Sequence, residues 1–204
     1  MIGWLFPGQG SQKVGMGLDF RESSEKAKKY FEQSEEIMNC KIQSIIFNGP
    51  KDILKKTEYT QPAIFIVSFI IGQSLIDRGL KPNALAGHSL GEYSALAIGG
   101  AFDFSTGLKL VKLRSKNMAS AGNIQKGTMA AIIGMDDKSV EQLCSSYEGS
   151  ETLVTANYNA PGQVVISGGP KAIQWAMVNS KKMGARMAVE LNVSGAFHSP
   201  LMAS

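Results

Sequence analysis

One ten-residue stretch, from Ala84 to Tyr93, constrains the fold of this chain more than any other. It carries a serine, Ser89, between Gly87 and Gly91, with a short apolar run before it and an amphipathic segment after it. This order predicts the strand, sharp turn and helix of a nucleophile elbow, which exposes the serine hydroxyl at the end of a sheet. Both glycines are needed because a β-carbon would collide with the backbone of the turn. Ser89 is therefore the candidate nucleophile.

The residue after the serine has a predicted role as well. Because the helix begins directly behind Ser89, the backbone N–H of Leu90 has no partner within the helix. A donor at this place is aimed where negative charge develops on an attacked carbonyl. Leu90 is therefore a candidate for an oxyanion hole.

An activated serine needs a general base, which is normally a histidine. The chain contains two histidines. His88 is adjacent to Ser89, and neighbouring side chains diverge at such a turn, so elimination favours His198 as the base. No acidic residue lies beside His198 in the sequence, Glu190 being the nearest. A Ser-His dyad is predicted rather than a full triad.

The composition is that of an ordinary globular protein. Of 204 residues, 44% are hydrophobic and 19% charged, which predicts one large domain or two small ones. The net charge of +4 comes from scattered lysines without interleaved aromatic residues, so nucleic-acid binding is not expected. Cys40 and Cys144 match no metal or redox spacing and are expected to be packing residues in a reducing cytoplasm.

Membrane association is not expected either. The apolar N-terminus lacks the basic flank of a signal peptide. The longest apolar run, from Ala63 to Ile71, is too short to span a bilayer.

The hydrophobic periodicity predicts an α/β fold whose first part is a larger unit. Expected parallel strands lie near 1–6, 84–87 and 189–193, and expected helices at 20–38, 60–77, 90–100 and 104–118. Thr60 is the expected N-cap of the second helix, with Pro62 in its first turn, and the apolar character of that helix requires burial. Asp103 is the expected cap of the last helix, and Gly122-Asn123 is expected to end the pattern.

A compositionally distinct section follows Asn123. Expected strands lie at 128–133, 153–156, 163–167 and 186–191, and expected helices at 137–147 and 170–183. This βαββαβ order is the ferredoxin-like arrangement. We therefore predict a small subdomain at 124–191, inserted in a large subdomain made of 1–123 and 192–204.

One arginine stands out in the helix expected at 104–118. On the helical wheel one arc is apolar and the opposite arc carries lysines: the first holds Leu110, Val111, Leu113 and Met118, the second Lys109, Lys112 and Lys116. Arg114 lies within the apolar arc, and a buried guanidinium needs an anionic partner. Two partners remain open: an acid of the protein itself, such as Glu92 or Glu58, or the carboxylate of a substrate.

Six short motifs are spread along the whole chain. They are Gly8-Gln9-Gly10-Ser11-Gln12, Thr60-Gln61-Pro62-Ala63, Gly87-His88-Ser89-Leu90-Gly91-Glu92, Arg114 with Met118, Asn157-Tyr158-Asn159-Ala160-Pro161-Gly162-Gln163 and Ala196-Phe197-His198-Ser199. In this order they resemble the malonyl-CoA:acyl carrier protein transacylases, acyltransferases of bacterial fatty-acid synthesis. The resemblance implies an α/β-hydrolase-like parallel-sheet core with an inserted ferredoxin-like subdomain.

The resemblance also implies a catalytic role for four positions. Ser89 would be the nucleophile and His198 its base. The backbone N–H groups of Gln9 and Leu90 would form the oxyanion hole.

Three further positions would contact the acyl group in such a family member. Arg114 would bind the malonyl carboxylate, while Met118 and Phe197 would line the acyl pocket. The Ala-Phe pair before His198 looks like the malonyl-selecting form of the motif.

The implied reaction moves a malonyl group from malonyl-CoA to the phosphopantetheine thiol of acyl carrier protein, through an acyl-enzyme on Ser89. No metal or other cofactor is expected, because both thioesters are similar in energy. The expected protein is a cytoplasmic monomer whose partners are malonyl-CoA and acyl carrier protein.

Family members continue well past the histidine motif, whereas this sequence stops at Ser204, so a fragment or a truncated protein is expected. Two alternatives remain open. A serine hydrolase or thioesterase would share the elbow and the dyad. A truncated, non-catalytic module would keep only the binding of a carrier protein.

Overall fold

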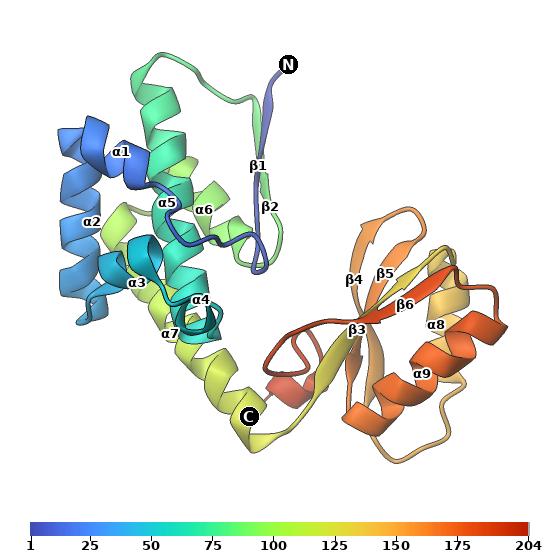
Figure 1. Cartoon of the computed structure of the whole chain (residues 1–204). Coiled ribbons are helices and arrows are strands. Elements are labelled where there is room, and N and C mark those ends of the chain that lie inside the picture. The colour runs from blue at the N-terminus through green and yellow to red at the C-terminus, as the bar shows by residue number, and fades with distance from the viewer. Residues whose placement is uncertain (204) are drawn as a thin grey trace. The chain divides into compact units, whose positions relative to one another are not determined.

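The computed structural model describes residues 1–203 and confirms an α/β fold (Figure 1). The chain divides into two compact units, Met1–Lys116 and a second unit from Asn117 onward. The first unit contains β1 (Gly3–Phe6), α1 (Leu18–Ser23), α2 (Glu25–Met38), α3 (Ile42–Asn48), α4 (Lys51–Leu54), α5 (Thr57–Asp77), β2 (Ala84–Gly87), α6 (Gly91–Ile98) and most of α7 (Phe104–Ile124).

The two strands of the first unit pair in parallel, as predicted, with Phe6 opposite Gly87. Because parallel strands end at the same edge, this register places the loop after β1 beside the turn after β2. The predicted third parallel strand at 189–193 is wrong. The residues Met187–Glu190 form β6, which pairs antiparallel with β3 in the other sheet of residues 1–203.

Helix α5 is the centre of the first unit's core. It lies between α2 and the β1–β2 pair (Figure 1), and every residue from Thr60 to Ile70 is buried. Its length and composition would suit a membrane span, but 67% of the relevant window is buried inside the protein, as in the core helix of a globular domain. The prediction of a buried helix is thus confirmed.

The predicted start of α5 is wrong by one turn. The helix begins at Thr57, with Lys56 at the N-cap, so Pro62 lies inside the helix rather than in its first turn. The hydroxyl of Thr60 does not cap the helix but donates to the carbonyl of Leu54. A buried hydroxyl requires such a partner, and here the preceding α4 provides it.

The helix predicted at 20–38 is two helices, α1 and α2. Ser24 separates them because its backbone is extended and its side chain accepts a hydrogen bond from the N–H of Ala27, which caps α2. The short helices α3 and α4 were not predicted. Both are too short to show a helical period in the sequence.

Helix α7 differs from the prediction in length and in its buried face. The side chain of Asp103 accepts from the N–H of Thr106 at 2.7 Å, as expected of a cap. Gly122 does not end the helix, which continues to Ile124. A β-carbon at Gly122 would lie 2.4 Å from the Ser194 carbonyl oxygen. The glycine therefore serves a close contact.

The predicted apolar arc of α7 is only partly buried. Leu110 and Leu113 are 41% and 57% exposed. The buried row consists of Phe104, Leu108, Val111 and Ser115. This row faces α5, since the rings of Phe104 and Phe65 stack with centroids 5.9 Å apart.

The second unit has the predicted order of strands and helices. It contains β3 (Thr128–Ile133), α8 (Asp137–Ser145), β4 (Leu153–Ala160), β5 (Gln163–Gly168), α9 (Pro170–Lys182), β6 and a short 3-10 helix, Pro200–Met202. The four strands form one antiparallel sheet in the order β4-β5-β3-β6. Figure 1 shows α8 and α9 together on one face of this sheet.

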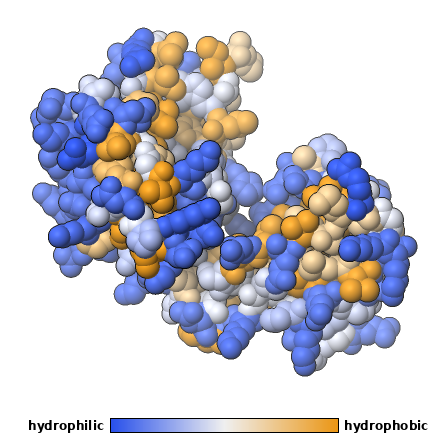
Figure 2. All heavy atoms as spheres, in the orientation of Figure 1, coloured by the Kyte–Doolittle hydropathy of each residue, from blue (hydrophilic) through white to orange (hydrophobic). Residues whose placement is uncertain are grey.

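The last described residues belong to the second unit by their contacts. Phe197 packs with Met129, Ala131 and Val165 in one apolar cluster. This grouping differs from the predicted assignment of 192–204 to the large subdomain. The predicted division into 1–123 with 192–204 and 124–191 stays a prediction. The face drawn in Figure 2 is largely hydrophilic, with apolar side chains interspersed.

Candidate active site

The residues around Ser89 form a strand, a sharp turn and a helix, as the sequence predicts. Strand β2 ends at Gly87, and α6 begins at Gly91. Between them the backbone of Ser89 has a φ of +52°, in the left-handed region that residues other than glycine rarely adopt. Such strain persists only where the surrounding structure imposes it, and it is a feature of functional sites.

The two flanking glycines allow three backbone segments to meet. A β-carbon on Gly87 would lie 1.9 Å from the carbonyl carbon of Gly91. A β-carbon on Gly91 would lie 2.1 Å from the carbonyl oxygen of Phe6, at the end of β1. Neither distance is sterically possible, so both positions require glycine, as predicted.

Two backbone donors near the turn have the properties expected of an oxyanion hole. Among residues 1–203, the N–H groups of Gln9 and Leu90 donate no hydrogen bond to another part of the chain. The loop that carries Gln9 is held beside the elbow because the N–H of His88 donates to the carbonyl of Phe6 at 3.0 Å. The side chain of Gln9 also donates to the hydroxyl of Thr57 at 3.4 Å.

His88 lies against the same loop. A β-carbon on Gly8 would come within 2.8 Å of the Nδ1 atom of His88. The imidazole thus packs beside the residue that precedes Gln9.

Arg114 reaches the elbow from α7. Its Nη2 donates to the Oγ of Ser89 at 2.9 Å, and its Nη1 donates to the Oε1 of Gln61 at 2.6 Å. The guanidinium carbon lies 5.7 Å from the centroid of the Tyr93 ring, within the range of a cation–π contact. Three elements, α5, α6 and α7, therefore hold the guanidinium beside the nucleophile.

Among the described residues, Arg114 forms no ion pair with an acidic side chain of the protein. Within 1–203 no carboxylate lies within 4.0 Å of the guanidinium nitrogens, and Glu92 and Glu58 are both exposed. Burial lowers the pKa of Arg114, while the nearby Tyr93 and Glu92 act in the opposite direction. The internal salt bridge, one of the two alternatives, is absent from this part of the chain.

The other candidate residues lie in the second unit. His198 is exposed, in the loop between β6 and the 3-10 helix, and has a φ of +56°. The hydroxyl of Ser199 donates to the carbonyl of Ala196 at 2.6 Å and so closes this loop. Phe197 is buried, and Met118 packs against the same apolar cluster.

Sequence reasoning missed the roles of Gln61 and Tyr93 as contacts of Arg114. Both residues are visible in the sequence, and Gln61 stands in the Thr60-Gln61-Pro62 motif. No local pattern relates them to Arg114, because they are 53 and 21 residues away from it. Only the packing of α5, α6 and α7 brings these side chains together.

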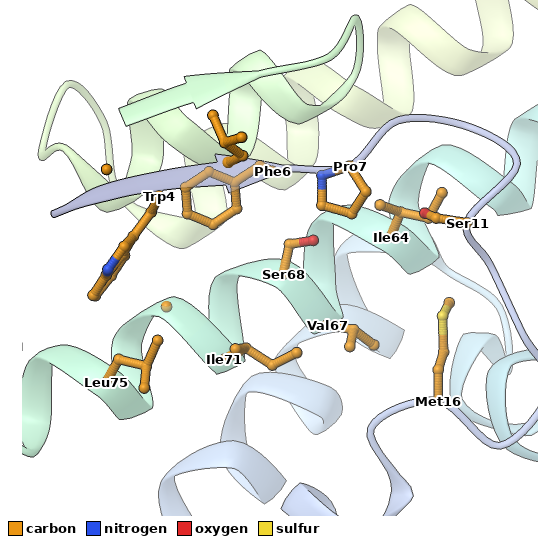
Figure 3. A pocket seen from close by; sticks show the side chains of 13 residues that line it. Trp4, Phe6, Pro7, Ser11, Met16, Ile64, Val67, Ser68, Ile71 and Leu75 are labelled. Atoms are coloured by element: carbon orange, nitrogen blue, oxygen red, sulfur yellow. The ribbon is translucent and has the colours of Figure 1, made fainter. Parts of the chain in front are cut away.

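The first unit also holds a cavity of about 520 Å³ between β1 and α5 (Figure 3). Trp4, Phe6, Val67, Ile71 and Leu75 line it with apolar side chains, and Ser68 points into it (Figure 3). None of the candidate catalytic residues lies in its wall. Among residues 1–203, no cluster of three or more His, Cys, Asp or Glu side chains is arranged to bind a metal ion.

Comparison with known proteins gives the family of the chain. The model of the family described as the acyl transferase domain matches residues 3–204. The chain belongs to the acyl transferase domain family. A curated relative of this acyl transferase domain, the malonyl CoA-acyl carrier protein transacylase of Bacillus subtilis, is 42% identical over 202 residues.

Solved structures agree with this assignment. An acyl carrier protein S-malonyltransferase from Vibrio cholerae is 40% identical, with a TM-score of 0.92, and the match covers 98% of this chain and 66% of that one. A malonyl-transacylase in complex with its type II PKS acyl-carrier protein is 36% identical, with a TM-score of 0.92, covering 98% and 65%. The match to the Bacillus subtilis relative covers 98% of this chain but only 64% of that protein. The chain therefore spans less than two thirds of the length of this relative.

Proposed function

We propose that this chain carries the malonyl-transfer site of an acyltransferase that moves a malonyl group from malonyl-CoA to the phosphopantetheine thiol of acyl carrier protein, for fatty-acid synthesis. The observation that carries the proposal is the guanidinium of Arg114, 2.9 Å from the hydroxyl of Ser89 in a strained elbow. A cation beside the nucleophile, without a carboxylate of residues 1–203 to neutralise it, suits an acyl group that carries its own carboxylate. The names of the relatives support the same donor and acceptor.

In the first half-reaction, Ser89 attacks the thioester carbonyl of malonyl-CoA while His198, the proposed base, takes the hydroxyl proton. The backbone N–H groups of Gln9 and Leu90 bind the oxyanion that forms. The C–S bond then breaks, and the histidine returns its proton to the departing CoA thiolate. The malonyl group remains as an ester on Ser89.

In the second half-reaction, the thiol of the carrier protein attacks this ester and gives its proton to His198. The ester bond breaks, Ser89 recovers its proton, and the malonyl thioester leaves on the carrier protein. One thioester replaces another of similar energy. The exchange therefore needs no metal, nucleotide or redox cofactor.

Arg114 is the proposed source of selectivity. The malonyl carboxylate would accept from the guanidinium, whereas an acetyl group would leave this half-buried charge without an anion. Met118 and Phe197 are proposed to line the acyl pocket. Their shared apolar cluster supports this role.

We further propose that the first unit is part of an α/β-hydrolase-like core and that β3 to β6 form a ferredoxin-like subdomain. The parallel β1–β2 pair with its elbow supports the first assignment, and the sheet order β4-β5-β3-β6 supports the second. A monomeric, cytoplasmic protein that binds neither nucleic acid nor membranes fits this proposal.

The test is intact-mass analysis after mixing the chain with malonyl-CoA. We expect a mass increase of one malonyl group, its absence in Ser89→Ala, and its retention in Ser145→Ala, a control on helix α8 of the second unit. His198→Ala should slow labelling about a hundredfold or more, the usual contribution of a general base. Labelling that persists in Ser89→Ala would refute the nucleophile.

Adding holo carrier protein separates transfer from the alternatives. Transfer predicts that the label moves to the carrier thiol. A hydrolase or thioesterase would release free malonate instead. A binding module without catalysis would bind the carrier protein while Ser89 stays unlabelled.

A further inference from the structure

Gln61 is a buried amide placed against the guanidinium of Arg114. Its side chain comes from α5, is 1% exposed, and accepts from Nη1 at 2.6 Å. The neighbouring Thr60 is fully buried and donates to the carbonyl of Leu54, so this bond anchors the helix turn that carries Gln61. The amide therefore projects from a helix turn that is anchored in the core.

The contact with Gln61 sets which way the guanidinium faces. With Nη1 bound to the amide, Nη2 is directed at the Ser89 hydroxyl, and the guanidinium carbon lies over the Tyr93 ring, 5.7 Å from its centroid. The guanidinium is a planar fork whose donors have fixed directions. Fixing Nη1 on the amide therefore fixes the direction of the other donors, with Nη2 beside the nucleophile.

The amide does this without cancelling the positive charge. A glutamate at the same place would form a buried ion pair with Arg114 and satisfy its charge before any substrate arrives. An amide oxygen carries only a dipole. In a site where no carboxylate of residues 1–203 lies within 4.0 Å, the charge stays available to an incoming anion.

We infer that Gln61 is a positioning and specificity-determining residue: its neutral oxygen orients Arg114 toward Ser89 and leaves the guanidinium uncompensated for the carboxylate of the acyl group. This inference rests on the proposed function, because it concerns how the same site selects malonyl over acetyl. Gln61 acts through Arg114. A change at Gln61 should therefore alter acyl selectivity more than the reactivity of Ser89.

The experiment measures the rate of Ser89 acylation by malonyl-CoA and by acetyl-CoA, as kcat/KM from time-resolved intact mass. For Gln61→Glu we expect malonyl labelling to fall about tenfold or more, because an internal carboxylate repels and replaces the substrate's. Acetyl labelling should change by less than about threefold, since acetyl carries no charge for the new carboxylate to repel. The malonyl-to-acetyl ratio therefore drops.

The matched control is Gln43→Glu. Gln43 also accepts from an arginine, Arg21, at 3.1 Å, but this pair lies on α3 and α1, outside the contacts of Ser89 and Arg114 described above. The same chemical change there should leave both rates and their ratio unaltered. Gln61→Met, close in size and neutral, removes the acceptor without adding charge. Gln61→Met should lower the rate of malonyl labelling, and its melting temperature should be nearer to that of wild type than the melting temperature of Gln61→Glu.

The outcomes are distinguishable. A Gln61→Glu chain that melts like wild type and keeps its malonyl-to-acetyl ratio overturns the inference, and so does an equal loss of both activities. If Gln61→Glu fails to fold, Gln61→Met decides by the same ratio, and an unchanged ratio overturns the inference. Failure of wild type to take up malonyl on Ser89 would instead overturn the proposed function.

Discussion

Gly91→Ala tests the close approach on which the elbow depends. From local propensity the substitution should stabilise the chain, because Gly91 is the first residue of α6 and alanine favours a helix over glycine by up to about 1 kcal/mol. The structure gives the opposite sign. The added β-carbon would lie 2.1 Å from the carbonyl oxygen of Phe6 and 2.9 Å from that of Pro7.

The magnitude follows from the size of the required movement. A carbon and an oxygen in contact need more than 3 Å, so β1 and α6 must separate by about 1 Å. Overpacking of this kind costs about 1–3 kcal/mol. At about 4 °C per kcal/mol for a unit of this size, the melting temperature should fall by roughly 4–12 °C.

Gly3→Ala, on β1, is the matched control. The nearest atom to its added β-carbon is 4.0 Å away, and its backbone is not in the left-handed region. We expect it to be neutral or to stabilise the chain by about 0.5 kcal/mol through the unfolded state.

The assay is urea unfolding followed by tryptophan fluorescence in a Trp175→Phe background. The remaining indole, Trp4, lies on β1 and reports the strand that the substitution displaces. Gly91→Ala should also slow Ser89 acylation, because the displaced strand carries the Gln9 loop. The reasoning is refuted if Gly91→Ala is as stable as Gly3→Ala.

Three further predictions concern buried side chains. Phe65→Ala should cost about 3–5 kcal/mol in urea unfolding, because loss of the fully buried ring leaves a cavity beside Phe104. Leu113→Ala, on the exposed side of α7, should cost less than about 0.5 kcal/mol. A large loss of stability in Leu113→Ala would mean that the apolar arc predicted from the sequence is the buried face of α7. Burial raises the pKa of Cys144 to about 11, so iodoacetamide at pH 8 should label it far more slowly in the folded chain than in urea, and equal rates would contradict its burial. Because the folded state keeps the thiol proton longer than the unfolded state, Cys144 should also lower stability as the pH rises from about 9 toward 11, an effect absent from Cys144→Ala.

The sequence alone determined the features that depend on neighbouring residues. The spacing of Gly87, Ser89 and Gly91 specifies a turn that only small flanking residues permit. The structure has that turn, and a β-carbon on either glycine would collide with the backbone, as predicted. The cap at Asp103 and the order of strands and helices in the second unit follow in the same way from local patterns. These signals are short-range, so one sequence suffices to read them.

The tertiary structure decided what depends on residues far apart in the chain. The strand at Met187–Glu190 could have joined either sheet, and pairing with β3 settled it. The wheel of α7 showed an apolar arc but not which part of it α5 would cover.

The partner of Arg114 is the most consequential of these outcomes. Its charge and its place on the helix indicated that a partner was needed, yet the sequence left open an acid of the protein, such as Glu92 or Glu58, and a substrate carboxylate, and it did not point to the amide of Gln61. Packing of α5 against α7 brought the amide within 2.6 Å and left the acids in solvent. Contacts of this kind arise only when the core forms, because the free energy of apolar burial, and not local propensity, sets how helices pack.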